Sequence, residues 1–201
     1  MIAIVDYGAG NIKSLQFALD KLNLDNCLTT DGEILRQSNA IILPGVGAFK
    51  DAMETLGTLG LTNVLKEEAV NGKPLLGICL GMQLFYEKSF EGGEWEGLGL
   101  LQGQILRINN SVKVPHMGWN TLACLINSPI LKDFPDQDYV YFVHSYAVQN
   151  YDQNSLAAST SHGGIIPAIV QQNNIIGMQF HPEKSGKSGL QLLQNFGELI
   201  S

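Results

Sequence analysis

Basic residues are scarce in this chain of 201 residues. Twelve lysines and arginines stand against 19 aspartates and glutamates, which gives a net charge of −7 at pH 7. This balance argues against binding to nucleic acid or to an anionic membrane, because both carry negative charge. Long apolar runs are also missing, since no stretch reaches the roughly 18 apolar residues that a membrane span requires. We therefore expect no nucleic-acid partner and no membrane partner.

Cysteine is also scarce, with three residues spaced far apart. An odd number of isolated cysteines does not suit a disulfide framework and is typical of a reducing compartment. The first residues enter a strand pattern directly, without a cleavable signal, so we expect a cytoplasmic protein. Linkers rich in proline, serine or charge are missing too, and apolar residues make up 45% of the chain. Residues 1–201 are therefore predicted to form one domain.

The first half of the chain alternates short apolar strands with helical patterns. We expect strands at 1–6, 40–43 and 75–78, a helix with apolar residues at Ile12, Leu15, Leu19 and Leu22, and one long helix over 50–70. Further strand-like segments follow at 97–100, 105–108, 139–143, 168–170 and 175–180, before a closing helix. Strand, helix and strand in succession predict parallel pairing. The fold class is therefore α/β, with a central, mostly parallel sheet flanked by helices and some antiparallel additions.

A candidate nucleophile lies in the segment Gly77–Gly81, directly after the third apolar strand. Glycines two residues before and two residues after Cys79 remove side chains that would clash in a tight strand-to-helix turn, as in the Gly-x-Ser-x-Gly elbow. The helix expected over 80–86 places its first backbone N–H groups near the sulfur. Cys27 and Cys124 have no such flanking glycines, and we expect them to be structural or incidental.

A candidate base follows the last apolar strand. His181 comes directly after that strand, and Glu183 stands two residues later with a rigid proline between them. A Cys-His pair needs a third group that fixes the imidazole tautomer and orientation, and a carboxylate can do so. We therefore predict a catalytic triad of Cys79, His181 and Glu183. His116 and His144 lie in aromatic-rich stretches and could be structural, while His162 looks like a solvated loop residue.

Together, these motifs resemble the class I, triad-type glutamine amidotransferases. The resemblance rests on the segments 4–11, 44–49, 77–83, 115–120, 141–146 and 180–185, which follow the family order over essentially the whole chain. It implies a flavodoxin-like three-layer sandwich and no cofactor or metal. It also implies that L-glutamine is the substrate, hydrolysed to glutamate and ammonia through a thioester on the cysteine.

The resemblance also assigns the groups around the nucleophile. A tetrahedral oxyanion needs preorganised donors, and the Leu80 N–H is one candidate by analogy with other nucleophile elbows. The second donor is the N–H of Val46 or Gly47, which the resemblance expects to turn toward the site only in the active conformation. The positions assigned to glutamine binding are Gly45, Gln83, Ser145 and Tyr146.

Released ammonia requires an acceptor, and nothing in the chain looks like an acceptor-substrate or nucleotide site. The turn at 8–11 lacks the third glycine of a dinucleotide fingerprint, since Lys13 stands in its place. Family members with similar 115–120 and 141–146 segments form a heterodimer with a (βα)₈-barrel cyclase subunit and pass ammonia to it through an internal channel. The resemblance places Tyr141, Lys184 and Asn11 at the docking face, and Met117 and Trp119 near the ammonia exit.

Three alternatives compete with this interpretation. A cysteine peptidase or stand-alone amidase would share the triad, but Gln83 after Cys79 suits a small amide better. A catalytically idle partner-binding subunit would not need all three triad residues. An amidotransferase subunit of anthranilate, aminodeoxychorismate or pyridoxal phosphate synthesis is disfavoured by the segments 115–120 and 141–146.

Overall fold

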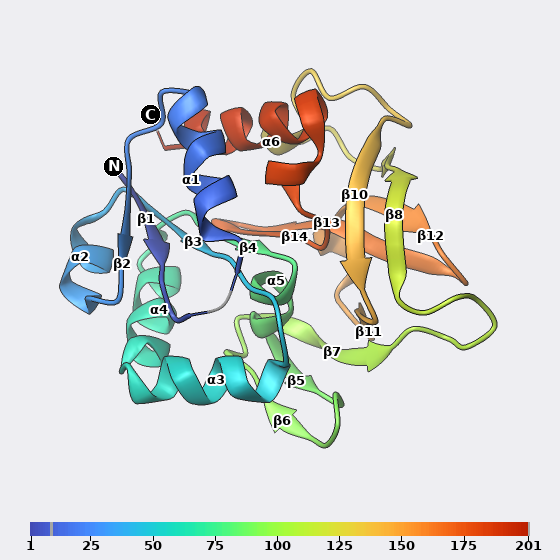
Figure 1. Ribbon diagram of the computed structural model, residues 1–201, viewed down its shortest axis with the longest axis horizontal. Helices are drawn as coiled ribbons and strands as arrows, with labels where there is room; N and C mark the ends of the chain where they lie inside the picture. Colours follow the sequence, from blue (N-terminus) through green and yellow to red (C-terminus); the bar gives the residue numbers. More distant parts are fainter. Residues whose placement is uncertain (9, 201) are drawn as a thin grey trace.

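The computed structural model describes residues 1–8 and 10–200. Its main sheet has eight strands in the order β2-β1-β3-β4-β14-β13-β12-β9 (Figure 1). The parallel part consists of β2 (Asn26–Thr29), β1 (Ile2–Val5), β3 (Ala40–Leu43), β4 (Leu75–Ile78) and β14 (Ile175–Met178). Antiparallel strands extend it through β13 (Ile165–Gln172), β12 (Leu156–Ser161) and β9 (Ala123–Cys124). The predicted α/β class is confirmed.

Helices cover both faces of this sheet, which makes three layers (Figure 1). One face carries α1 (Ile12–Lys21) and α6 (Gly186–Glu198), and the other carries α2 (Gly32–Gln37), α3 (Phe49–Thr58) and α4 (Leu61–Val70). Successive side chains of a strand point to opposite faces. Accordingly, Ile2 and Ile4 pack in the core beneath α1, while Ala3 and Val5 pack in the core beneath α3. The short central strands are therefore apolar throughout because both of their faces are buried.

Two smaller sheets flank the main one. β8 (His116–Thr121) and β10 (Tyr139–His144) form an antiparallel pair, which we call the β8–β10 ribbon. The second sheet has the order β11-β7-β5-β6, with β11 (Tyr146–Gln149), β7 (Leu101–Arg107), β5 (Tyr86–Ser89) and β6 (Trp95–Glu96). The remaining elements are α5 (Leu80–Leu84) and the 3₁₀ turns η1 (Pro129–Leu131), η2 (Gln153–Ser155) and η3 (Pro182–Lys184). The β8–β10 ribbon lies at the right of the view, and the four-stranded sheet lies below α5 (Figure 1).

Three sequence-based expectations about these elements are wrong. The helix expected over 50–70 is two helices, because Gly60 between them adopts a left-handed φ of 68°. The helix expected over 80–86 ends at Leu84, and Tyr86 already begins β5. The segment 97–100 is a loop rather than a strand, since its backbone N–H groups donate to the carbonyls of residues 84–87 and wrap it around the end of α5.

The candidate site lies at the carboxyl edge of the parallel strands. β4 and β14 are neighbours in register, with Ile78 opposite Met178. The chain therefore leaves both strands at the same height, and the N–H of Cys79 donates to the carbonyl of Met178 at 2.7 Å. β3 lies on the other side of β4 and ends at Leu43. Ligands of open α/β sheets bind at this edge, so the loops that follow these strands form the candidate functional site.

We predict that Gly81→Ala destabilises the protein by about 3 kcal/mol or more, because overpacking against a fixed backbone is costly. A Cβ at Gly81 would lie 1.7 Å from the carbonyl oxygen of Leu43, which belongs to the central sheet. Gly57→Ala is the matched control, since nothing lies within 4 Å of its Cβ position in the exposed part of α3. It should stabilise the helix by about 0.5–1 kcal/mol. Urea denaturation checks both, and equal midpoints for the two variants would contradict the expectation.

Candidate active site

Cys79 occupies a strained turn between β4 and α5. Its backbone has φ 54° and ψ −110°, which side-chain-bearing residues rarely adopt. The flanking glycines are required as predicted, because a Cβ at Gly77 would lie 2.7 Å from the backbone of Met82. The predicted elbow is therefore present. The turn holds a largely buried thiol, 6% exposed, at the edge of the sheet.

His181 and Glu183 lie beside this thiol and contact each other. Nδ1 of His181 donates to Oε1 of Glu183 at 2.9 Å, and both side chains are at most 4% exposed. The N–H of His181 donates to the carbonyl of Tyr141 at 3.0 Å, which ties the residue to β10. Among the described residues, the buried Nε2 has no hydrogen-bond partner. This nitrogen is therefore free to exchange a proton with a group at the sulfur.

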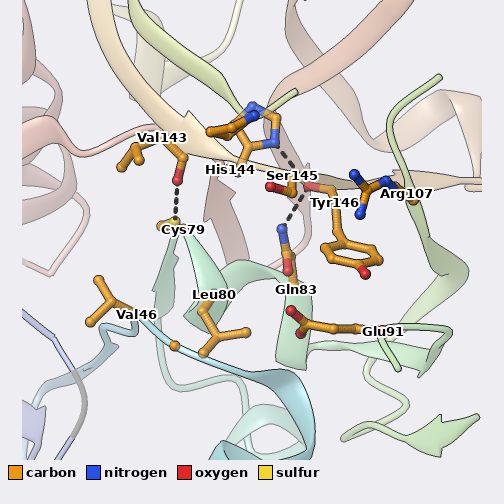
Figure 2. A pocket seen from close by; sticks show the side chains of 12 residues that line it. Val46, Cys79, Leu80, Gln83, Glu91, Arg107, Val143, His144, Ser145 and Tyr146 are labelled. Atoms are coloured by element: carbon orange, nitrogen blue, oxygen red, sulfur yellow. Dashed lines mark hydrogen bonds between the residues drawn. The ribbon is translucent and has the colours of Figure 1, made fainter. Parts of the chain in front are cut away.

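The charge state of His181 depends on these two neighbours. Burial lowers its pKa, but the interactions with Cys79 and Glu183 outweigh burial and raise the pKa to about 9. The thiol itself donates to the carbonyl of Val143 at 3.8 Å, as Figure 2 shows. The sulfur is thus hydrogen-bonded to β10 instead of to the imidazole. The structure therefore brings the three predicted triad residues together.

A pocket of about 420 Å³ opens next to the sulfur (Figure 2). Its walls come from the turn after β3, from α5, from the β5–β6 connection and from the end of β10. The lining residues are Val46, Gly47, Cys79, Leu80, Gln83, Glu91, Arg107, Pro115, Val143, His144, Ser145 and Tyr146. Six of the residues predicted to surround the nucleophile are therefore brought together here. Gly45 is the exception, because it does not line this pocket.

Gly45 instead permits a close approach of backbones behind the nucleophile. A Cβ there would lie 2.4 Å from Oη of Tyr7 and 3.0 Å from the N of Gly81. The Tyr7 hydroxyl donates to the carbonyl of Pro44 at 2.8 Å and fixes this turn, and burial raises the Tyr7 pKa far above its usual range. Gly47 has a left-handed φ of 106°, so the turn reverses there.

Val46 and Leu80 lie on the side of Cys79 opposite Val143, and Val46 is 42% exposed (Figure 2). The predicted oxyanion donors therefore belong to one wall of the pocket, and the carbonyl that accepts from the thiol belongs to another. A carbonyl carbon bound next to the sulfur would lie between these two walls.

Five pocket residues were not predicted from the sequence: Glu91, Arg107, Pro115, Val143 and His144. Glu91 reaches the pocket because Oε2 accepts from the N–H of Phe49 at 2.8 Å and so caps α3. No local pattern signals this contact between residues 42 positions apart. Arg107 ends β7 opposite Tyr146, a register that depends on strand pairing.

The histidines outside the triad form a cluster beside the pocket. Nδ1 of His116 lies 3.0 Å from Nε2 of His144, and the ring of His162 stacks on His116 at 4.1 Å. His162 is a loop residue as expected, but it is only partly exposed and its Nε2 lies 2.8 Å from the carbonyl of Lys113. Burial and the neighbouring histidines lower the pKa of His116 to about 3, and burial lowers that of His144 to about 4. Both rings are therefore neutral at pH 7.

The predicted docking residues lie on adjoining elements. Met117 and Trp119 are 62% and 55% exposed on β8, and the Trp119 ring contacts that of Tyr141 edge-on at 5.9 Å. Lys184 is exposed in η3, which contacts both α1 and β10. Asn11 directly precedes α1 and is exposed, and its side chain makes no capping hydrogen bond with the described residues. Ala9, in the same predicted loop as Asn11, lies outside the described residues.

The described residues contain neither a candidate membrane span nor a candidate metal site. In residues 1–8 and 10–200, no helix is both long enough and apolar enough to cross a membrane. Within the same ranges, no group of three or more His, Cys, Asp or Glu side chains is arranged to hold a metal ion.

Comparison with known proteins decides the family. The family model of class I glutamine amidotransferases matches residues 3–199. The chain belongs to this family. Among its relatives, the imidazole glycerol phosphate synthase subunit HisH of Oceanobacillus iheyensis is 62% identical over 200 residues, covering 100% of both chains. The protein of the same name from Caldanaerobacter subterraneus subsp. tengcongensis is 47% identical, covering 100% of this chain and 98% of its own.

Two solved structures share the fold at low sequence identity. A structure described as a glutamine amidotransferase aligns with a TM-score of 0.79 at 19% identity, covering 100% of this chain and 99% of its own. The structure of PurLQS from Thermotoga maritima aligns with a TM-score of 0.78 at 21% identity, covering 100% and 98%. The three-layer architecture is thus shared with both of these structures.

The neutral histidine pair predicts how stability depends on pH. Unfolded histidine titrates near 6.5, whereas folded His116 and His144 titrate at about 3 and 4. Between these values the unfolded state binds protons that the folded state does not, so stability falls as pH decreases below about 6.5. His116→Gln removes one such group and should reduce the slope of unfolding free energy against pH by up to about 1.4 kcal/mol per pH unit. Urea denaturation between pH 4 and 7 measures this, and parallel curves for variant and wild type would refute it.

Proposed function

We propose that this chain is the glutaminase subunit of an imidazole glycerol phosphate synthase, acting as one glutamine amidotransferase domain over residues 1–201. The observation that carries the proposal is the position of Cys79, on a left-handed elbow between a buried His-Glu pair and a pocket of about 420 Å³. Full-length relatives named as the HisH subunit of that enzyme support the choice within the family.

The proposed reaction starts from a Cys79 thiolate beside a His181 imidazolium, the pair that forms when the thiol gives its proton to Nε2 and that the raised pKa of His181 favours. The sulfur attacks the side-chain carbonyl of glutamine, a C–S bond forms, and the C–N bond then breaks as His181 returns the proton to the departing ammonia. Water attacks the resulting γ-glutamyl thioester while His181 takes one of its protons. The C–S bond breaks, the sulfur regains the proton, and glutamate leaves. Glu183 holds the imidazole with Nδ1 protonated, so that Nε2 carries each transfer.

The oxyanion of each tetrahedral intermediate needs donors on the side of the sulfur away from Val143. We propose the N–H of Leu80, at the start of α5, together with the N–H of Val46 or Gly47. Both segments line the pocket. Gly47 has a left-handed φ and no side chain, so the turn can come close to the substrate carbonyl. The thiol donates to Val143 in this arrangement, so a shift of the sulfur toward His181 must precede attack.

Glutamine has two charged ends that the pocket can match. Glu91 supplies a carboxylate for the α-ammonium group, and Arg107 supplies a guanidinium for the α-carboxylate. The side-chain nitrogen of Gln83 is already engaged by Gln179 and the Tyr146 carbonyl, so Gln83 shapes the pocket wall. Ser145 and Tyr146 close the pocket from the end of β10, where Figure 2 shows them facing Gln83.

Ammonia is useful only if it is delivered, so we propose a (βα)₈-barrel cyclase subunit as the partner in a heterodimer. The cyclase would combine ammonia with a phosphoribulosyl-formimino-AICAR phosphate to make imidazole glycerol phosphate and AICAR, in histidine biosynthesis. The exposed side chains of Met117 and Trp119 and the adjoining Asn11, Tyr141 and Lys184 would form the contact and the ammonia exit. The hydrogen bond from the thiol to β10 supports low turnover in the isolated subunit.

The deciding experiment measures glutamate released from glutamine by the purified chain, alone and with a cognate cyclase and its nucleotide ligand. We expect turnover to rise strongly with the liganded cyclase and to vanish in Cys79→Ala. Full activity of the isolated chain would refute partner control. Activity that no cyclase stimulates, or cleavage of peptides, would assign the site to another amidotransferase or to an amidase.

A second experiment tests how the ends of glutamine are recognised. Glu91→Gln keeps an oxygen that can cap α3 but removes the negative charge, so KM for glutamine should rise about 10–100-fold with little change in kcat, as for loss of a charged hydrogen bond. Glu94→Gln, in the same connection but exposed and paired with Lys88, is the matched control and should leave KM unchanged. An unchanged KM in Glu91→Gln would remove Glu91 from the binding site.

A further inference from the structure

Gln179 is a buried polar residue that the catalytic steps above do not use. It lies between β14 and His181 with 0% exposure. Its Nε2 lies 3.9 Å from Sγ of Cys79, and its Oε1 accepts from Nε2 of Gln83 at 2.9 Å. A fully buried amide keeps its place only when its polar atoms are paired. Here one of the paired atoms is the proposed nucleophile itself.

We propose that Gln179 holds an amide N–H against the sulfur of Cys79, and that a one-directional chain of hydrogen bonds fixes this orientation. The alternative orientation of the same amide would place a carbonyl oxygen at the sulfur. An N–H donor stabilises negative charge that develops on sulfur, whereas a carbonyl oxygen repels it. The proposal rests on Cys79 as the nucleophile.

The direction of the chain follows from its backbone acceptors. The Tyr146 carbonyl can only accept, so Gln83 must present its nitrogen there, at 2.9 Å. The same nitrogen reaches Gln179 at 2.9 Å, so the facing atom of Gln179 must be its oxygen. The nitrogen of Gln179 is then the atom left to face the sulfur. Neither amide can rotate by 180° without placing two like groups in contact.

The histidine cluster holds the Tyr146 carbonyl from the other side. Nδ1 of His144 lies 2.8 Å from that carbonyl and must carry a hydrogen, so its Nε2 is an acceptor. Nδ1 of His116 donates to this Nε2, and Nε2 of His116 accepts from the side-chain nitrogen of Asn120 at 3.1 Å. Asn120 is fixed in turn because the same nitrogen donates to the carbonyl of Ser161. Every link from β8 to the sulfur therefore has one donor and one acceptor.

The first test replaces Gln179 with an isosteric acid. Gln179→Glu keeps an oxygen that accepts from Gln83 but removes the N–H at the sulfur, so alkylation of Cys79 by iodoacetamide should slow by about tenfold or more. Peptide mass spectrometry separates this site from Cys27 and Cys124. The same rate in folded Gln179→Glu and wild type would overturn the proposal. Gln179→Met, without charge, should slow the reaction in the same direction and replaces the first variant if that one does not fold.

Asn195→Asp is the matched control for this test. Asn195 is also a buried amide, 1% exposed, but its nitrogen donates to the carbonyls of Ile130 and Lys132. This variant should lose stability and keep the wild-type alkylation rate. Equal slowing in both variants would attribute the effect to the fold and overturn the role of Gln179. In glutamine turnover with the cyclase, Gln179→Glu should lower kcat and leave KM nearly unchanged, because Gln179 does not line the pocket.

The second test observes the imidazole tautomers by ¹⁵N NMR. His116 and His144 should both carry their hydrogen on Nδ1, whereas His162 should carry it on Nε2, which faces the Lys113 carbonyl. The three rings therefore give an internal contrast in one spectrum. A hydrogen on Nε2 of His144 would break the chain at Tyr146 and overturn the proposal. Neither alkylation nor tautomer depends on glutamine turnover, so their failure is distinguishable from failure of the proposed function.

Discussion

The close approach of α5 to β3 sets the position of the whole site. Gly81 in the first turn of α5 leaves no space for a side chain against the Leu43 carbonyl, and Gly77 leaves none against Met82. The helix must therefore begin directly at the end of β4, and the chain turns within the single residue Cys79. A left-handed cysteine costs conformational energy and persists because packing on both sides over-determines it. The backbone of Cys79 is therefore fixed, and the walls of the pocket surround its sulfur.

The buried histidines of this half of the molecule differ in charge state, although burial lowers the pKa of His181, His116 and His144 alike. His181 has a carboxylate and a thiol as neighbours, and these outweigh burial and keep its proton available at neutral pH. His116 and His144 have each other and neutral polar groups as hydrogen-bond partners, so burial dominates and they stay uncharged. The same residue type is thus charged at neutral pH at one position and uncharged at another, because its neighbours differ.

Sequence predicts the parts of the site that depend on local geometry. The glycines around Cys79 and the strand before His181 are visible in the chain, and register between β4 and β14 brings the two residues together. Glu91 was not predictable, because it reaches the pocket through a tertiary contact with the start of α3. Gln179 is the polar residue in the apolar run 175–180, and this position alone indicates a buried amide that must find hydrogen-bond partners.

The prediction of the fold failed where one residue or a tertiary contact overrides a pattern. The apolar spacing of 50–70 continues through Gly60, yet its left-handed backbone ends the helix. In the part of the chain described, the β8–β10 ribbon pairs with no third strand. It contacts the segment after β14 through the backbone of Tyr141, whose carbonyl accepts from the N–H of His181 and whose N–H donates to Oγ of Ser185. β10 is nevertheless packed into the body of the molecule, since Val140 and Phe142 are fully buried in the core beneath α1 and α6. One strand, β10, thus carries both the carbonyl that accepts from the Cys79 thiol and the carbonyl that accepts from the backbone N–H of His181, so any displacement of β10 reaches both groups at once.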